Sequence, residues 1–248
     1  VMNGIALYHN LIPYGGTFLI FSDYCKPSIR LSALMGLRVI YIFSHDSIGL
    51  GEDGPTHQPI EQLAGLRAIP NLNVFRPADM NETLECWEAS LNNEKGPSAI
   101  ILSRQKLKYI SSLPTDKNKC SLGAYELNIS SHDNLVTILA SGSEVEIALT
   151  VQSELKNLNI ESKVISVPCQ ELFDIQSDEY KNKILEPKNL IVSIEAGSTS
   201  CWHKYTGKNG KTIGINTFGK SAPYKLIFEK FNLTSNSIVS LIQDHLRR

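Results

Sequence analysis

The chain has 248 residues, of which 42% are apolar and 20% charged, as in an ordinary soluble globular protein with room for two domains. The formal net charge is -1 and no Lys/Arg run exceeds two residues, which argues against nucleic acid or an anionic membrane as partner. No stretch has the length and apolar character of a membrane span, and the five scattered cysteines lack a C-x-x-C pair, so we expect reduced thiols and a cytoplasmic location.

The first hundred residues alternate short β-rich runs with amphipathic stretches. Strands are predicted at residues 17–22, 39–43, 72–75 and 98–103. Helices are predicted at residues 27–35, entered through Pro27, at residues 59–69 with Pro59 as first helical residue, and after a capping box of Asp79 and Glu82. Residues 1–7 have the apolar pattern of a continuing helix, so we expect the sequence to be a piece of a longer protein.

Residues 106–121 lose the periodic apolar positions and are predicted to be an interdomain linker. A second alternation follows, with strands at residues 135–140, 163–167, 190–194 and 212–216, a helix after a capping box of Ser143 and Glu146, and a closing helix at residues 235–246. The fold class predicted is therefore α/β, with two consecutive three-layer α/β/α domains and mostly parallel sheets, at residues 1–105 and 122–248.

Residues 45–59 are the segment best suited to contact a polar ligand. They hold two histidines, three acidic residues and three glycines between a predicted strand and a predicted helix, at the edge where open α/β sheets bind ligands. His45 follows the strand end, and Asp53 and His57 flank the Gly54-Pro55 turn. Imidazole and carboxylate groups together suit a polyhydroxylated substrate. For each residue alone, a solvated surface loop with turn-capping histidines is the rival interpretation.

The string HDSIGLGEDGPTHQP at residues 45–59 resembles the signature loop of the transketolase family. Further matches follow in family order at residues 13–24, 102–105, 142–146, 195–197 and 217–223, so the resemblance covers essentially the whole chain. It implies the domain that binds the pyrimidine ring of thiamine diphosphate, incomplete at its N-terminus, and the C-terminal domain. The implied reaction transfers a two-carbon ketol unit between sugar phosphates in the pentose phosphate pathway.

The resemblance also implies a cofactor pocket. Phe21 is expected to stack on the aminopyrimidine ring, with Phe18 and Tyr24 completing the aromatic surroundings. Stacking adds about 0.5–1.5 kcal/mol beyond burial. Taken alone, Phe18 would be assigned to a hydrophobic core.

The same resemblance implies substrate contacts. His45 and Arg104 match residues that hold the substrate phosphate, for which the guanidinium fork is well shaped. Asp53 matches the residue that reads a donor hydroxyl. His57 matches a catalytic residue that contacts the donor near the reacting carbons and assists proton transfer. Arg104 in a salt bridge, and the loop residues as turn caps, are the alternatives.

No residue of this sequence matches the family's catalytic glutamate or the domain that binds diphosphate with Mg or Ca, and no metal ligand is expected here. We therefore expect that the chain alone binds no cofactor, and that it is inactive without the amino-terminal diphosphate-binding domain. Family sites lie between subunits, so we also expect a homodimer, in which a partner buries the surfaces near Ile48, Leu50 and Leu63.

Two alternatives remain. The synthase of 1-deoxyxylulose 5-phosphate and the β subunits of 2-oxo acid dehydrogenases share this arrangement but lack residues 51–59 in this form. A non-catalytic assembly or regulatory module is a hypothesis of a different class, because the C-terminal domain shows no catalytic constellation. Its more distinctive residues are interpreted as packing, interface or helix-capping positions: Ser143, Glu144, Glu195, Cys201, Trp202 and His203.

Overall fold

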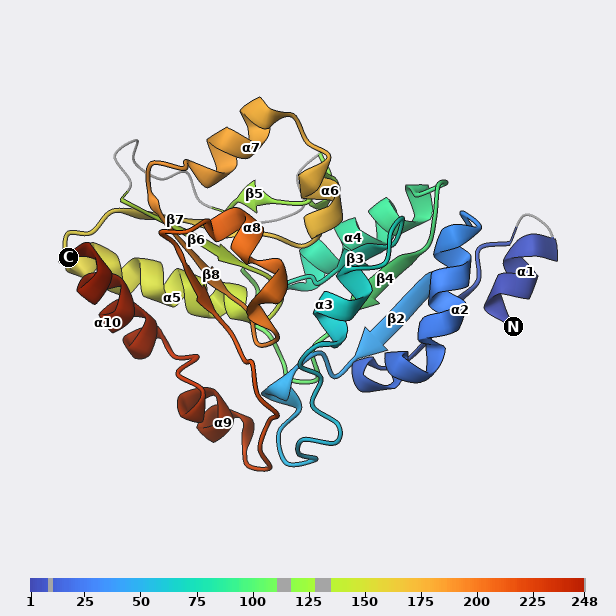
Figure 1. The fold of residues 1–248 in the computed structure, drawn as a ribbon, viewed down its shortest axis with the longest axis horizontal. Coiled ribbons are helices and arrows are strands. Elements are labelled where there is room, and N and C mark those ends of the chain that lie inside the picture. Colours follow the sequence, from blue (N-terminus) through green and yellow to red (C-terminus); the bar gives the residue numbers. More distant parts are fainter. Residues whose placement is uncertain (9–10, 111–116, 128–134, 248) are drawn as a thin grey trace.

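The computed structural model describes residues 1–8, 11–110, 117–127 and 135–247. Two α/β units follow one another along the chain and lie side by side (Figure 1). Most of their strands run parallel, so the predicted α/β class is confirmed. Part of the predicted linker, residues 111–116, lies outside the described residues.

The N-terminal unit is built on a sheet of four parallel strands in the order β1-β2-β4-β3. The strands are β1 Tyr14–Phe18, β2 Ile40–Ser44, β3 Asn73–Phe75 and β4 Ser98–Ile101. The helices are α1 Met2–Tyr8, α2 Ser22–Leu34, α3 Gln62–Arg67 and α4 Met80–Asn92. Tyr41 and Phe43 of β2 pack with Leu63 and Leu66 of α3, whereas Ile40 faces the opposite side, so both faces of the sheet are covered.

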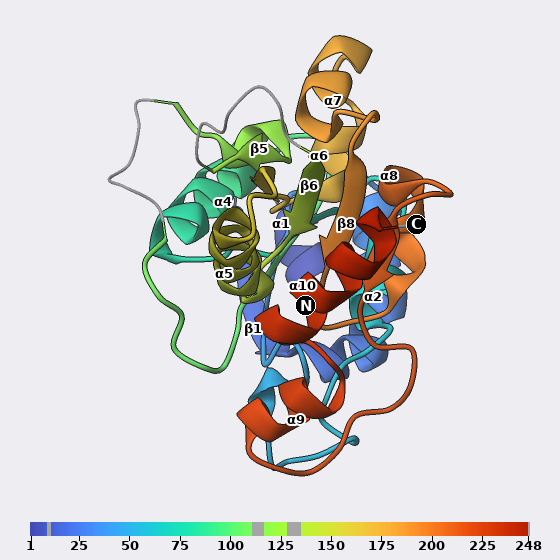
Figure 2. The same cartoon turned by 90° about the vertical axis from the view of Figure 1, so that its left-hand side faces the viewer.

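The C-terminal unit has a five-stranded sheet in the order β5-β7-β6-β8-β9, in which only β5 is antiparallel to its neighbour. The strands are β5 Tyr125–Glu126, β6 Val136–Ala140, β7 Ser162–Ser166, β8 Leu190–Ile194 and β9 Lys211–Ile213. The helices are α5 Glu144–Asn157, α6 Gln170–Asp174, α7 Asp178–Leu185, α8 His203–Thr206, α9 Tyr224–Lys230 and α10 Ser235–Leu246. Figure 2 shows α5 and α10 next to each other.

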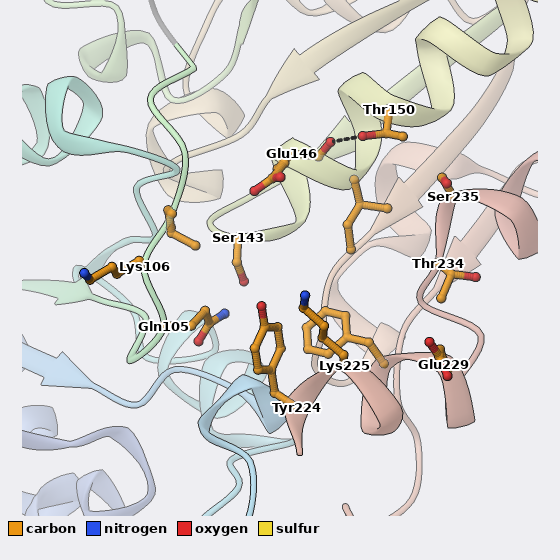
Figure 3. A pocket seen from close by; sticks show the side chains of 13 residues that line it. Gln105, Lys106, Ser143, Glu146, Thr150, Tyr224, Lys225, Glu229, Thr234 and Ser235 are labelled. Carbon is orange, nitrogen blue, oxygen red and sulfur yellow. Dashed lines mark hydrogen bonds between the residues drawn. The ribbon is translucent and has the colours of Figure 1, made fainter. Parts of the chain in front are cut away.

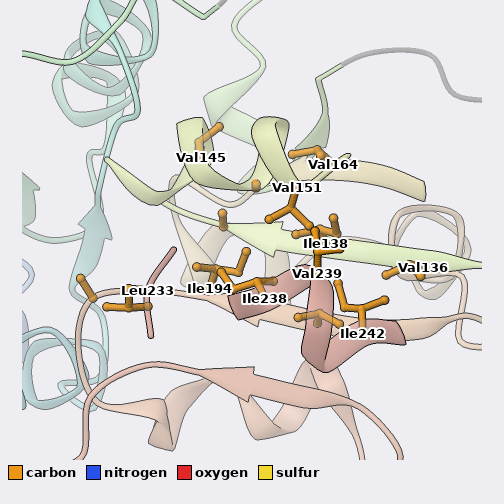
Figure 4. Packing of buried hydrophobic residues seen from close by; sticks show 14 of the residues in the cluster. Val136, Ile138, Val145, Val151, Val164, Ile194, Leu233, Ile238, Val239 and Ile242 are labelled. Atoms are coloured by element: carbon orange, nitrogen blue, oxygen red, sulfur yellow. The ribbon is translucent and has the colours of Figure 1, made fainter. Parts of the chain in front are cut away.

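Successive residues of the central strands enter different hydrophobic clusters, which is the signature of three layers. Ile138 packs under α5 and α10 with Val151 and Ile242 (Figure 4). Its neighbour Leu139 packs on the opposite face with Trp202. Removing the side chain of a fully buried residue of this kind costs about 2–5 kcal/mol.

The predicted strand at residues 17–22 is wrong in its bounds. The strand ends at Phe18, and a 3-10 turn at Leu19–Phe21 leads directly into α2. Leu19 is fully buried in this turn, so an apolar residue that suggested a strand is buried without one. Pro27 was predicted at the start of a helix but lies inside α2. In this position it removes one backbone hydrogen bond of the helix.

One predicted helix start and one predicted capping bond also differ, although α5 begins directly after Ser143 as predicted. Helix α3 begins at Gln62 rather than Pro59, because the Gln62 side chain accepts a hydrogen bond from the Ile60 N–H and so caps the turn before the helix. Ser143 forms no capping bond, since its hydroxyl donates to the Glu144 carboxylate. The Asp79 cap is confirmed, with its carboxylate accepting from the Glu82 N–H at 2.9 Å.

The short helices α6 to α9 were not predicted. Each has between four and eight residues, too few for a helical period to stand out. Across the described residues, no helix combines the length and the apolar character that crossing a bilayer requires.

Candidate functional site

The predicted site residues come from the carboxyl ends of three adjacent parallel strands. Phe18 ends β1, His45 follows β2, and Arg104 lies three residues beyond β4. Because β2 pairs with both β1 and β4 in parallel, these side chains leave the sheet at one edge. This is the edge at which open α/β sheets bind ligands.

Aromatic rings connect the β1 end to the polar loop. The Phe18 ring stacks on the His45 imidazole with centroids 3.6 Å apart, and it lies parallel to Phe21 at 5.9 Å. Phe21 in turn contacts Tyr24 at 6.1 Å and meets His57 edge-on at 5.8 Å. Phe18 and Phe21 are half-buried, while Tyr24 is 85% exposed. Five of the seven predicted residues therefore form one continuous group.

His45 adopts a left-handed backbone conformation, with φ of 59°. This conformation is strained for a residue with a side chain and persists only where the surroundings enforce it. The next residue, Asp46, is buried and accepts hydrogen bonds from Arg76 Nε at 3.1 Å and Nη2 at 2.7 Å. Ser47 then caps the 3-10 turn Ile48–Leu50 by accepting from the Gly49 N–H. The buried ion pair thus holds the chain where His45 turns.

The pKa of His45 lies below its ordinary value. Partial burial is the largest cause, and the charge of Arg104 lowers the pKa further, while Asp53 opposes both. His45 is therefore a neutral imidazole near neutral pH, with its Nδ1 3.0 Å from the Ser44 hydroxyl. Arg104 and Asp53 therefore lie close enough to His45 for their charges to act on it.

Two of the three glycines in residues 45–59 have a positive φ that favours glycine. Gly51 and Gly54 have φ of 89° and 78°. Asp53 is exposed, and the His57 ring Nδ1 lies 3.0 Å from the Thr56 hydroxyl. Asp53 and His57 thus present polar groups at the rim of the aromatic cluster.

Sequence reasoning missed a buried ionic network between the two units. The Arg76 guanidinium is fully buried and contacts Asp46 and the carboxylate of Glu144, and its Nη1 donates to the Ser141 carbonyl at 2.8 Å. Desolvation lowers the pKa of Arg76, but the carboxylates of Glu144 and Asp46 outweigh it and raise that pKa overall. The sequence offered one sign of this network, because the charged residue Arg76 directly follows strand β3. Its partners could not be identified from sequence, since they lie on other elements.

A second buried pair adjoins this network. Arg67 of α3 donates to both carboxylate oxygens of Glu195, at 2.7 and 2.9 Å. Trp202 Nε1 also donates to Glu195, at 2.7 Å. Burial alone would raise the pKa of Glu195, but Arg67 and Arg76 overcome this effect and lower it to about 2. The interpretation of Glu195 and Trp202 as packing or interface residues fits these contacts.

The apolar surfaces expected to be covered by a partner are covered by the chain itself. Ile48, Leu50 and Leu63 are at most 3% exposed. Ile48 belongs to the hydrophobic core of the C-terminal unit, and Leu63 to that of the N-terminal unit. That expectation was wrong because Ile48 packs into the C-terminal unit and Leu63 is buried within the N-terminal unit itself.

A separate cleft of about 320 Å³ lies where the two units meet. Figure 3 shows Tyr224 of α9 pointing toward Gln105 and Ser143, with Lys225 beside it. Tyr224 also lies against Gly51 of the loop. The cleft therefore borders the loop of residues 45–59 from the side of the C-terminal unit.

Fold and site together define a two-unit α/β protein with a contiguous group of aromatic and polar side chains at the carboxyl edge of its first sheet. Residues 1–109 match the family profile "Transketolase, pyrimidine binding domain", and residues 123–234 match "Transketolase-like TK C-terminal domain". The chain belongs to the transketolase family.

Individual relatives agree with this assignment. A transketolase of Sinorhizobium medicae is 49% identical over all of this chain, which spans 36% of that relative. The crystal structure of a Campylobacter jejuni transketolase matches 98% of this chain and 37% of its own, at 42% identity and a TM-score of 0.91. A structure described as "Split gene transketolase, inactive beta4 tetramer" has the same fold, with a TM-score of 0.82 at 23% identity. The match covers 99% of this chain and 80% of that one. The chain thus spans little more than a third of the curated relatives.

The residues present fit one part of thiamine diphosphate, the cofactor of this family. The half-buried faces of Phe18 and Phe21 suit a flat heteroaromatic ring. The part of the chain that the structure describes contains no group of three or more His, Cys, Asp or Glu residues placed to hold a metal ion.

Proposed function

We propose that this chain contributes the pyrimidine-facing and sugar-facing half of a transketolase active site, for transfer of a two-carbon ketol unit between sugar phosphates. The observation that carries the proposal is that the aromatic side chains and the two histidines are in direct contact. Aromatic rings suited to a cofactor touch His45 and His57, which are suited to a sugar phosphate. Residues suited to the cofactor and residues suited to the sugar phosphate therefore adjoin one another.

In this proposal Phe21 lies against the aminopyrimidine ring, with Phe18 and Tyr24 around it. Phe18 also supports the His45 imidazole through their stacking contact. When bound, thiamine diphosphate supplies the nucleophilic carbon that accepts the two-carbon unit. The aromatic side chains orient its ring and exclude water from one face.

Arg104 and His45 bind the substrate phosphate. Arg104 supplies a full positive charge, and the neutral His45 donates one N–H. A hydrogen bond to a charged group contributes about 1.5–3 kcal/mol, so this pair can anchor the distal end of the sugar.

Asp53 and His57 act nearer to the reacting carbons. The exposed carboxylate of Asp53 accepts a hydrogen bond from a donor hydroxyl and so distinguishes stereoisomers. His57 is the proposed catalytic residue of this chain, because its ring lies against Phe21, where cofactor and donor would meet. Its imidazole holds or moves a proton at a donor hydroxyl.

The diphosphate and its Mg or Ca ion require residues outside these 248, so we propose that the polypeptide by itself is inactive. It works with an amino-terminal diphosphate-binding domain, in a homodimer formed through the domain that contains Phe21. Exposed apolar side chains of α2 support such an interface, including Leu34 at 71% exposure. The five cysteines, all free thiols, suit the reducing cytoplasm.

A chimera tests the proposal. These 248 residues replace the homologous part of the Sinorhizobium medicae enzyme, and turnover is followed with xylulose 5-phosphate, ribose 5-phosphate, thiamine diphosphate and magnesium. We expect turnover by the chimera and none by the isolated 248-residue chain. A correctly folded but inactive chimera would reject the transketolase function. Turnover by the isolated chain would reject the proposed incomplete site.

A further inference from the structure

Gln58 ties the sugar-facing loop to the C-terminal unit. Its side chain is buried, and Nε2 donates at 2.8 Å both to the Gly51 carbonyl and to the Lys220 carbonyl. One amide group thereby joins the two limbs of the loop to a segment 162 residues away. The backbone on either side of Asp53 is closed into a ring by this contact.

Ser221 makes a second connection next to Asp53. Its hydroxyl donates to the Glu52 carbonyl at 2.5 Å. On the other side of Asp53, a Cβ added at Gly54 would lie 3.2 Å from the Ser221 Cβ. Asp53 therefore stands between two residues that both rest against Ser221.

Gly219 has no side chain, and the Gln58 side chain fills the space beside it. A Cβ at Gly219 would lie 1.7 Å from the Gln58 Oε1, so no larger residue fits while Gln58 keeps its position. The side chain of Asp53 is exposed, so its position depends on the backbone that these contacts hold.

We propose that residues 217–224 of the C-terminal unit position Asp53 and His57 for reading the sugar, with Gly219, Ser221 and Gln58 as positioning residues. The inference rests on the proposed function and gives the C-terminal domain a role in substrate selectivity. The segment acts through the loop backbone and touches no substrate itself.

The first test uses the complete 248-residue chain and needs no activity. Gly219→Ala displaces Gln58, so we expect the His57 ring resonances to shift in NMR spectra while those of His203 and His245 stay unchanged. Gly4→Ala is the matched control, because nothing lies within 4 Å of a Cβ at that position. Ser221→Ala, which removes one exposed hydroxyl, provides the same readout if Gly219→Ala does not fold. Unchanged His57 resonances in a folded variant overturn the proposal.

The second test measures selectivity in the chimera. For Gly219→Ala and Ser221→Ala we expect kcat/KM to fall up to about tenfold with xylulose 5-phosphate, as for one lost hydrogen bond. With hydroxypyruvate, which keeps the ketol group near His57 but has no further sugar hydroxyl for Asp53 to read, we expect a smaller loss. Equal losses with both donors overturn the proposal. An inactive unaltered chimera counts against the proposed function instead, and the NMR test then decides the positioning role by itself.

Discussion

The Phe21 ring meets the His57 imidazole edge-on, with the ring centroids 5.8 Å apart. These residues lie on different elements, one in the turn after β1 and the other near the end of the loop after β2. Their contact means that the residues proposed to face the cofactor and those proposed to face the sugar adjoin one another. Had they been remote, the proposed site would have had no structural basis.

Phe21→Leu should weaken thiamine diphosphate binding in the chimera. Loss of ring stacking at about 0.5–1.5 kcal/mol predicts up to a tenfold rise in the cofactor concentration for half-maximal activity. Tyr14→Leu is the control, since Tyr14 is an exposed aromatic residue of β1 that packs on Trp87. An unchanged cofactor requirement for Phe21→Leu would remove Phe21 from the cofactor pocket.

Arg104→Met should raise KM for a phosphorylated donor about tenfold or more, because a charged hydrogen bond of 1.5–3 kcal/mol is lost. The expected change with hydroxypyruvate, which has no phosphate, is small. Lys106→Met removes an exposed positive charge two residues away and serves as the control. If both donors lose equally, Arg104 has a structural role rather than one in phosphate binding.

Arg104→Gln should also raise the pKa of His45 in the isolated chain. The Arg104 charge disfavours protonation of the imidazole, so its removal shifts the titration to higher pH, while the larger effect of burial remains. An NMR titration of the His45 ring between pH 4 and 8 measures the change. A titration that stays in place would mean that Arg104 does not face His45 in solution.

Arg67→Met should destabilise the folded chain by about 3–5 kcal/mol, because it leaves the Glu195 carboxylate buried without its main partner. Urea unfolding followed by Trp202 fluorescence measures the loss. Lys108→Met breaks an exposed ion pair with Glu146 and should lower the free energy of unfolding far less, because solvent screens that pair. Similar losses in the two variants would contradict the buried pair.

The same pair predicts acid sensitivity. The pKa of Glu195 falls from an ordinary 4.5 to about 2 on folding, so the folded state holds fewer protons than the unfolded state between these values. The stability contributed by Glu195 is fully present above pH 4.5 and is lost as the pH falls toward 2. Glu195→Gln should remove this dependence from the urea midpoints measured across that window. A variant with the wild-type pH slope would exclude Glu195 as its source.

Local pattern was sufficient for the central strands. Val136–Ala140 and Leu190–Ile194 are mostly apolar and buried along their whole length, and the prediction for the second has the observed bounds. Residues 17–22 failed because a β-rich composition also suits a buried 3-10 turn. Resemblance, rather than pattern, brought Arg104 and Phe21 into the site, and their roles stay predictions.

Gln58 and Arg76 could not be interpreted from sequence because their partners are distant along the chain. Arg76 bonds to Ser141 and Gln58 to Lys220, contacts that no local periodicity encodes. Such residues become recognisable only when the two units are seen against each other.

Arg76 lies on the first unit, yet its charge is balanced by Asp46 from that unit and Glu144 from the second. If the connection between the units were cut and the pieces separated, Arg76 would remain on one piece and Glu144 on the other. Each charge would then be exposed to water on a surface that is complementary to the other piece. The two pieces should therefore melt together in a single transition and reassociate after cleavage. Recombination between homologues is then expected to succeed when both units are exchanged as one block.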